Sequence, residues 1–199
     1  FTVERHIRSK WACAKCETLV QAPVEAHVID KGIPTTGLLA QVLVAKFADH
    51  LPLYRQEAIF ARAGFAIPRS TLAQWVGSCG VQLQPLVNAL KSEVLKFSVL
   101  HADETPVQQL DPKAKLSGTK KAYLWAYRSN SLDSQDPIVV FDYQGNREGR
   151  HVRAFLGDWQ GHLVVDDYGG YKALFEATNT EGKRLRTEVG CWAHIRRKF

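Results

Sequence analysis

Apolar and polar residues follow two different periods along the chain, and the change comes near residue 98. Between residues 35 and 97, apolar residues recur every three or four positions, which predicts a series of amphipathic helices. From residue 98 onward, short apolar runs alternate with turns rich in Gly, Pro, Asp and Asn, which predicts strands. We therefore expect a helical region followed by a mixed sheet.

Four helices are expected in the helical region, delimited by residues that cap or break helices. Thr36 is a candidate N-cap, and Gly64 is suited to the position just after a helix end. The expected helices cover residues 36–50, 53–63, 68–76 and 81–97.

The second and third of these helices are joined by a turn that contains Gly. This arrangement is typical of a helix-turn-helix motif, although helical hairpins also occur in proteins that never contact DNA. In the DNA-binding interpretation, the start of the third helix reaches base edges and phosphates. The candidate contact residues there are Arg69, Ser70, Thr71 and Gln74.

The second half of the chain predicts the element order βββαβαβα. Expected strands cover residues 98–102, 122–128, 138–143, 162–165 and 187–192, with helices near 151–159, 168–177 and from 193 onward. This is the order of the ribonuclease-H-like fold, in which the first and fourth strands lie side by side. Asp103 follows the first strand and Asp166 the fourth, so we expect this mixed α/β (α+β) fold to bring them together.

Two acids at strand ends suit the binding of divalent metal for phosphate chemistry, since they are held by the sheet and reach solvent. Two-metal nucleases and polynucleotidyl transferases hold their ions about 3.5–4 Å apart, so that they stabilise the attacking and leaving oxygens. An Asp after a strand is also a common turn residue or helix N-cap, and Asp103 fits that alternative. Glu104, next to it, has no assigned role.

Residues 1–20 predict short alternating strands around Cys13 and Cys16. The C-x-x-C spacing lets two thiolates share one tetrahedral zinc ion, and a closed site needs four ligands. His6 and His27 lack convincing ligand spacing, so we expect the other ligands upstream of Phe1. Plain packing and a redox pair remain alternatives, the latter weakened by the absence of a βαβ context.

Composition places the chain among ordinary globular proteins of one to two domains. The 199 residues are 45% apolar and 23% charged. No run approaches the roughly 18–20 apolar residues of a membrane span, so we expect no membrane partner. Four cysteines in a chain this long do not form a secretory disulfide framework, which favours a reducing cytoplasm.

The charge is basic, with a net value of +6 and a pI near 9.2. Such a balance favours a polyanionic partner, and the basic residues cluster between two expected strands and near the last residues. A solvated basic face is the alternative for either cluster. The candidate nucleic-acid contacts in these clusters are Lys120, Lys121, Arg196, Arg197 and Lys198.

Six phrases carry a family resemblance along nearly the whole chain. They are KWACAKC, GIPTTGLLAQVLVAKFADHLPLYRQEAIFARAG, RSTLAQWVG, LHADETPV, GHLVVDDYGGYKALFE and CWAHIRRKF. With these phrases in the family's order, the chain closely resembles a bacterial insertion-sequence transposase of the IS-sixty-six type, a DDE transposase. Because the chain begins with Phe1 and lacks Met, we expect it to be an internal fragment.

The resemblance implies three regions. Residues 1–30 would be the second half of a zinc-binding segment, residues 31–97 a helical DNA-binding region, and residues 98–199 a ribonuclease-H-like catalytic core truncated before its third acid. Asp103 and Asp166 match the first two acids of the triad, which in the complete protein would hold two Mg²⁺ ions. Asp167 stands where relatives tend to have Gly.

The third acid of the family, a Glu on a later helix, is expected beyond Phe199, because Glu188 precedes the fifth strand. Cys191 and His194 match a C-x-x-H feature found after the fifth strand in several DDE transposases. That feature is structural or supports the active site. A buried strand cysteine is the alternative for Cys191.

The function implied by the resemblance is metal-dependent hydrolysis of a phosphodiester at insertion-sequence ends, followed by strand transfer to target DNA. The partners would be double-stranded DNA and other copies of the chain, in a bacterial cytoplasm and at the nucleoid. We expect this fragment to bind DNA without cutting it. The alternatives are a non-catalytic DNA-binding remnant of a transposase and a metal-dependent nuclease unrelated to transposition.

Overall fold

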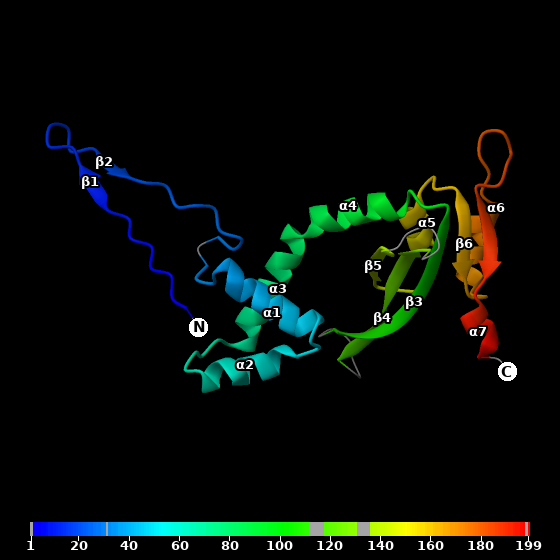
Figure 1. The fold of residues 1–199 in the computed structure, drawn as a ribbon, viewed down its shortest axis with the longest axis horizontal. Coiled ribbons are helices and arrows are strands. Elements are labelled where there is room, and N and C mark those ends of the chain that lie inside the picture. Colours follow the sequence, from blue (N-terminus) through cyan, green and yellow to red (C-terminus); the bar gives the residue numbers. More distant parts are fainter. Residues whose placement is uncertain (1, 31, 112–117, 131–135, 198) are drawn as a thin grey trace. The chain divides into compact units, whose positions relative to one another are not determined.

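The computed structural model describes residues 2–30, 32–111, 118–130, 136–197 and 199. The chain forms two compact units, Phe1–Gln84 and Pro85–Phe199 (Figure 1). The described part holds seven α-helices, a two-stranded hairpin and a five-stranded mixed sheet, which confirms the mixed α/β class. None of the helices in these ranges is long and apolar enough to cross a bilayer.

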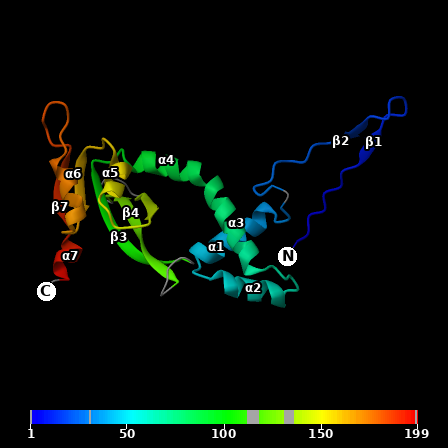
Figure 2. The same cartoon turned by 180° about the vertical axis from the view of Figure 1, so that it is seen from behind.

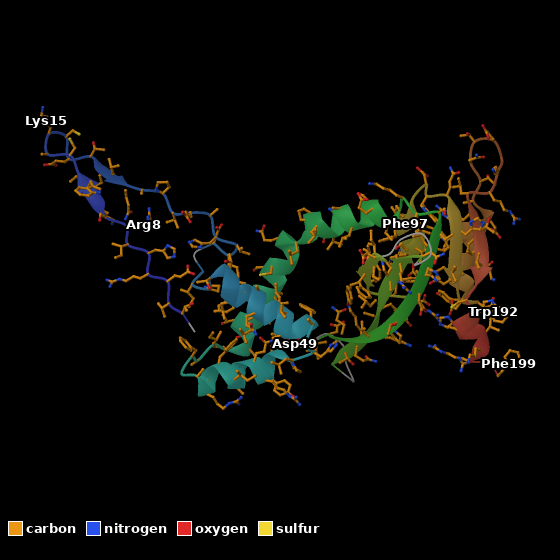
Figure 3. All side chains as sticks on the ribbon, viewed as in Figure 1. Arg8, Lys15, Asp49, Phe97, Trp192 and Phe199 are labelled. Carbon is orange, nitrogen blue, oxygen red and sulfur yellow. The ribbon has the colours of Figure 1, made fainter. Side chains whose placement is uncertain are left out.

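The first unit begins with a small antiparallel hairpin. Strand β1 (Lys10–Ala12) pairs with β2 (Leu19–Gln21), and both strands are exposed. Cys13 and Cys16 lie in the turn between them, and the Lys15 side chain marks the tip of this turn in Figure 3. The hairpin therefore presents the C-x-x-C sequence to solvent.

Three helices form the core of the first unit: α1 (Thr36–Phe47), α2 (Leu53–Arg62) and α3 (Arg69–Gln82). The N-cap of α1 is Thr35, one residue before the expected position, because its hydroxyl accepts a hydrogen bond from the Leu38 amide at 3.3 Å. Helix α3 runs well past residue 76. Its buried residues continue at helical spacing, which keeps the helix packed on the others: Leu72, Trp75 and Cys79.

The second unit is built on a sheet with the strand order β5-β4-β3-β6-β7. Strands β3 (Val99–Leu110), β4 (Thr119–Ser129) and β5 (Val139–Gln144) are antiparallel neighbours. Strand β6 (Gly161–Val165) lies parallel to β3 and to β7 (Arg186–Gly190). The expected adjacency of the first and fourth strands of this unit is confirmed.

Strand β3 is longer than the sequence predicted, and Asp103 lies inside it rather than after it. The pattern was interrupted by Pro106, which normally argues against a strand. Beyond His101 the strand pairs with β4 alone among the described strands. On its other edge, no described strand needs a hydrogen bond from the main-chain N–H groups of this part of β3. A proline is tolerated at such an edge.

Helices cover one face of this sheet. Helix α4 (Gln84–Val94) leads into β3, and α5 (Arg150–Leu156), the 3-10 turn η1 (Gly169–Tyr171) and α6 (Lys172–Glu176) follow later strands. Figures 1 and 2 show α5 and α6 on the same side of the sheet. Their apolar residues form one core with alternate residues of the strands, such as Leu100 and Leu163. The last helix is α7 (Trp192–Arg196).

A buried arginine joins β7 to these helices. Arg186 is 4% exposed. Its guanidinium donates to the carbonyl oxygen of Gly157, at the end of α5, and to that of Leu174 in α6, at 3.5 Å. Carbonyls at helix ends have no partner within the helix, so Arg186 satisfies a group that burial would otherwise leave unpaired.

We predict that Arg186→Ala lowers the free energy of unfolding by about 1–3 kcal/mol, because it leaves a buried carbonyl oxygen without a hydrogen-bond donor. Arg184→Ala removes the same charge from an exposed position and should cost less than about 0.5 kcal/mol. Urea denaturation followed by circular dichroism measures both. Equal losses in the two variants would contradict the role assigned to Arg186.

Candidate active site

The two candidate catalytic acids lie at matching levels of neighbouring strands. The parallel ladder between β3 and β6 ends at the pair His101 and Val164. Asp103 and Asp166 each follow two residues later. Adjacent strands are about 4.8 Å apart, so the sheet places these two main-chain positions close to each other.

Each of the two carboxylates has one oxygen held by the main chain. Asp103 Oδ1 accepts from the Glu104 amide at 2.9 Å, and Asp166 Oδ1 accepts from the Tyr168 amide at 3.0 Å. Each Oδ2 atom instead lies near a basic side chain. Asp103 Oδ2 is 3.7 Å from His194 Nε2, and Asp166 Oδ2 is 3.8 Å from an Arg147 guanidinium nitrogen. Both carboxylates are thus oriented, with one oxygen left for a further ligand.

Glu104 points to the opposite face of β3 from Asp103 and is buried, with a side chain that is 0% exposed. Its Oε2 accepts from the Tyr171 hydroxyl at 2.6 Å, and its Oε1 accepts from Arg147 Nε at 2.5 Å. Burial raises the pKa of Glu104 above its usual range, and the hydrogen bonds from Tyr171 and Arg147 oppose this rise. The carboxylate is therefore held on both oxygens.

Tyr171 is as constrained as its partner. Burial, together with the neighbouring Glu104 carboxylate, raises the pKa of the Tyr171 hydroxyl far above its usual range. The hydroxyl therefore stays protonated and serves as a permanent hydrogen-bond donor. Its ring packs edge-on against Trp125 and Tyr168, with centroid distances of 6.0 and 5.8 Å.

Arg147 connects Glu104 to Asp166. Besides its contacts to both carboxylates, its guanidinium carbon lies 3.8 Å from the centroid of the Tyr168 ring. The Tyr168 hydroxyl in turn donates to the Arg147 carbonyl oxygen at 2.5 Å. A cation over an aromatic face gains attraction from the ring, so both the side chain and the main chain of Arg147 are fixed.

Two glycines make this connection possible. Gly149, just before α5, and Gly170, in η1, approach so closely that a Cβ atom on Gly149 would overlap the Gly170 carbonyl oxygen. A Cβ atom on Gly170 would overlap the Tyr168 ring. The loop that carries Arg147 can therefore lie directly against the segment that follows Asp166.

A cleft of about 670 Å³ opens beside Asp166. It lies where β6 and β7 end and α7 begins, and the main chain of Cys191 continues the ladder by donating to the Val165 carbonyl oxygen at 2.9 Å. Trp192 and Phe199 project from this C-terminal segment in Figure 3. The residues that line the cleft include Arg147, Asp166, Cys191, His194 and Arg197.

The predicted acids and the C-x-x-H pair therefore fall in one place. His194 joins the two groups, because its Nε2 faces Asp103 while its ring borders the cleft with Asp166. Its Nδ1 is buried without a hydrogen-bond partner in the described part of the chain. Cys191 is a half-buried free cysteine.

Cys13 and Cys16 lie in the hairpin turn of the first unit. Hydrogen bonds from the Thr18 side chain and main chain, and then from the Cys13 thiol, hold the pKa of the Cys16 thiol below its ordinary value. His6 and His27 contact each other edge-on, with centroids 6.0 Å apart. Across the described residues, no group of three or more His, Cys, Asp or Glu side chains is arranged to hold a metal ion.

The predicted DNA contacts are divided between the units. At the start of α3, Arg69, Ser70 and Gln74 are exposed and Thr71 is half-buried. Helix α2 supports this helix start, because Glu57 Oε1 accepts from the Arg69 amide at 2.9 Å.

The basic residues of the second unit lie in two places. Lys120 and Lys121 pair with Gln109 and Gln108 at the far end of the β3–β4 ladder, away from the paired acids. Arg196 ends α7 and Arg197 follows it, both exposed, whereas Lys198 is outside the described residues.

Comparison with known proteins identifies the family to which this sequence belongs. The sequence matches the Transposase IS66 family over residues 31–199, a range that includes α1–α3, the sheet and both acids. The chain belongs to the IS66 transposase family. The resemblance inferred from the sequence is confirmed. At the level of the family, membership indicates transposition by a DDE-type polynucleotidyl transferase that needs divalent metal and acts on DNA.

Curated relatives of this family member come from Sinorhizobium fredii (strain NBRC 101917 / NGR234). The uncharacterized protein y4qI is 39% identical over 196 residues, which are 96% of this chain and 36% of that protein. The uncharacterized protein y4jD is 36% identical over 201 residues, covering 99% of this chain and 39% of the relative. The chain therefore spans little more than a third of the length of these relatives.

Sequence reasoning missed the residues behind the acids: Glu104, Arg147, Tyr168 and Tyr171. A signal for Glu104 exists once β3 is extended past Ala102. In the alternation of the longer strand, Glu104 falls on the same side as the apolar Leu100 and Ala102, which indicates burial. A buried carboxylate requires a partner. No spacing rule pointed to Arg147, which reaches Glu104 only through tertiary packing.

We predict that Tyr171→Phe lowers the free energy of unfolding by about 1–3 kcal/mol, because a buried carboxylate oxygen loses its donor. Tyr143→Phe is the matched control, since the exposed Tyr143 hydroxyl binds Gln109 at the surface. It should cost less than about 0.5 kcal/mol. Thermal unfolding of both variants measures the difference, and a neutral Tyr171→Phe would contradict the importance of this bond.

Proposed function

We propose that the second unit is the ribonuclease-H-like core of a DDE transposase, with Asp103 and Asp166 as its first two catalytic acids. The observation that carries this proposal is their position at matching levels of β3 and β6 in a member of the IS66 transposase family. The reaction would be hydrolysis of a phosphodiester at an insertion-sequence end, followed by strand transfer to target DNA.

The donor set fits a hard divalent cation such as Mg²⁺. Carboxylate oxygens are the protein ligands that Mg²⁺ prefers, and it usually keeps water and substrate oxygens beside one or two of them. The Oδ2 atoms of Asp103 and Asp166 accept no hydrogen bond within the described part, so they can take this role. Bound there, a pair of ions would activate the attacking oxygen and stabilise the leaving one.

The chain's own residues would orient these acids. The amides of Glu104 and Tyr168 fix the Oδ1 atoms, so that each carboxylate turns its Oδ2 outward. Arg147 offsets the charge that Asp166 and Glu104 concentrate beside the cleft, and His194 lies against Asp103. Such fixed dipoles and charges limit the rearrangement that the site needs when substrate binds.

We propose that α2 and α3 bind double-stranded DNA, with Arg69, Ser70, Thr71 and Gln74 at the recognition surface. This is supported by the exposure of Arg69, Ser70 and Gln74 in the first turns of α3, whereas Leu72 and Trp75 are buried. Lys120, Lys121, Arg196, Arg197 and Lys198 would contribute sequence-independent attraction to phosphates. A homo-oligomer on DNA at the nucleoid follows from the same proposal.

We propose that Cys13 and Cys16 supply two ligands of a structural Zn²⁺ site whose other ligands lie upstream. The support is the placement of both free thiols in one tight, exposed turn. Thiolates are the form that binds zinc, and the lowered pKa of Cys16 favours that form.

The second candidate function is that of a non-catalytic DNA-binding remnant. No group of three side chains is arranged to hold metal among the described residues, and this fits both candidates, because the first expects only two of the three acids in this chain. Metal binding at the acid pair separates the two candidates. A remnant has no reason to retain a site where both carboxylates contribute to affinity.

We predict that the chain binds Mn²⁺, used as a probe for Mg²⁺, and that Asp103→Asn and Asp166→Asn each weaken binding about tenfold or more, because each removes a charged ligand. Asp167→Asn is the control. The Asp167 carboxylate is 78% exposed and pairs with Lys172 at 3.2 Å, so its loss should leave Mn²⁺ affinity unchanged.

Isothermal titration of the three variants beside the unchanged chain gives the affinities. No Mn²⁺ binding by the unchanged chain would favour the remnant. A loss in Asp167→Asn that equals the loss in Asp166→Asn would contradict the choice of the second acid.

We predict that Arg69→Ala and Gln74→Ala erode sequence preference more than total affinity for DNA, because contacts to base edges carry the sequence information. Arg196→Ala and Arg197→Ala should lower affinity for all sequences and flatten the salt dependence, because phosphate contacts release counterions. Selection from a random duplex library measures preference, and fluorescence anisotropy against salt measures affinity. The opposite pattern would contradict the assignment of α3 as the recognition helix.

A further inference from the structure

Arg147 has a second role that the acid pair does not explain. A buried carboxylate needs one counter-charge, and a guanidinium that served only Glu104 could be buried with it. Instead the Arg147 side chain is 39% exposed and lines the cleft beside Asp166. The residue therefore presents charge to whatever enters the cleft.

The geometry leaves donors available for such a ligand. Nε donates to Glu104, and one terminal nitrogen lies near both Glu104 and Asp166. Nη1 makes no hydrogen bond to any described residue of the chain. Since guanidinium carries five N–H donors in a planar fork, the outward edge can still bind an anion.

The fixed position of Arg147 also matters. Ordering a free arginine costs side-chain entropy, and here the Tyr168 ring and Glu104 have already restricted the side chain of Arg147. A fixed fork beside metal-binding carboxylates matches the two oxygens of a phosphodiester, which guanidinium binds through paired hydrogen bonds. Arg197, exposed on the same cleft, adds a second positive charge.

We propose that Arg147 binds a backbone phosphate of DNA in the cleft beside Asp166, and that Glu104 with Tyr168 positions its guanidinium for that contact. The proposal rests on the proposed function, because it takes DNA as the ligand. It adds Arg147 to the residues of the reaction as a phosphate-binding residue and gives buried Glu104 a positioning role.

The test compares Arg147→Gln with Arg150→Gln. Arg150 lies three residues away, is 62% exposed, pairs with Glu148 at 2.9 Å and does not line the described cleft, so its variant removes the same charge nearby. Binding of a short fluorescent DNA duplex is measured by anisotropy without divalent metal, over a range of salt. Arg147→Gln should weaken binding about tenfold and lower the salt slope by roughly 1, and Arg150→Gln should change both clearly less.

Two further variants protect the test against misfolding. Glu104→Gln removes the buried charge that needs Arg147 and also the group that positions it, so Glu104→Gln alone should weaken DNA binding. Adding Arg147→Gln to Glu104→Gln should then cause a further drop that is smaller than the drop in the otherwise unchanged chain. Arg147→Lys keeps the charge and loses the fork, so it should retain most of the salt slope while binding more weakly.

The outcomes separate this inference from the function on which it rests. Absence of DNA binding by the unchanged chain would overturn both. Binding that falls equally in the Arg147 and Arg150 variants would overturn the phosphate contact alone, and would leave Arg147 as the counter-charge of Glu104.

Discussion

The burial of the Glu104 carboxylate is the constraint on which the rest of the site depends. A charged group on the covered face of a central strand is tolerated only when both oxygens are bound. Tyr171 and Arg147 meet that requirement, and they come from segments far from β3 in the sequence. Their contacts fix the η1 turn and the loop before α5 against the same strand. The position of Asp166 and the border of the cleft follow from these contacts.

The adjacent residues Asp103 and Glu104 lie on opposite faces of β3 and have different roles. Alternation turns Asp103 outward, where its charge is solvated and available to a ligand, and Glu104 inward, where its charge organises the interior. Arg147 contacts both the inward-facing Glu104 and Asp166. Strand β3 is therefore connected to Asp166 in two ways, through this arginine and through its pairing with β6. A change at Glu104 would therefore be felt at Asp166, although the two carboxylates share no direct contact in the described network.

The sequence predicted the order of elements in the second unit, because strand alternation and helix spacing are local signals. The adjacency of β3 and β6 also followed, since the order βββαβαβα has a known pairing. The full length of β3 could not be predicted, because Pro106 is a local signal against a strand. The proline is tolerated because, among the described strands, β3 has no partner on one edge beyond His101. Arg147 was not found for a similar reason: its contacts are made across loops, and no period in the sequence encodes them. The burial of Glu104 did not follow either, because the expected strand ended at Ala102 and the alternation that turns Glu104 inward depends on the longer β3.

The close approach of Gly149 and Gly170 has a consequence for how this family can vary. The Gly170 carbonyl leaves no room for a Cβ atom on Gly149, and the Tyr168 ring occupies the space that a Cβ atom on Gly170 would need. The loop before α5 and the turn after β6 therefore cannot change length independently, because an insertion in one would separate Arg147 from Tyr168 and Asp166. Descendants of this sequence should alter the two loops together or leave both as they are.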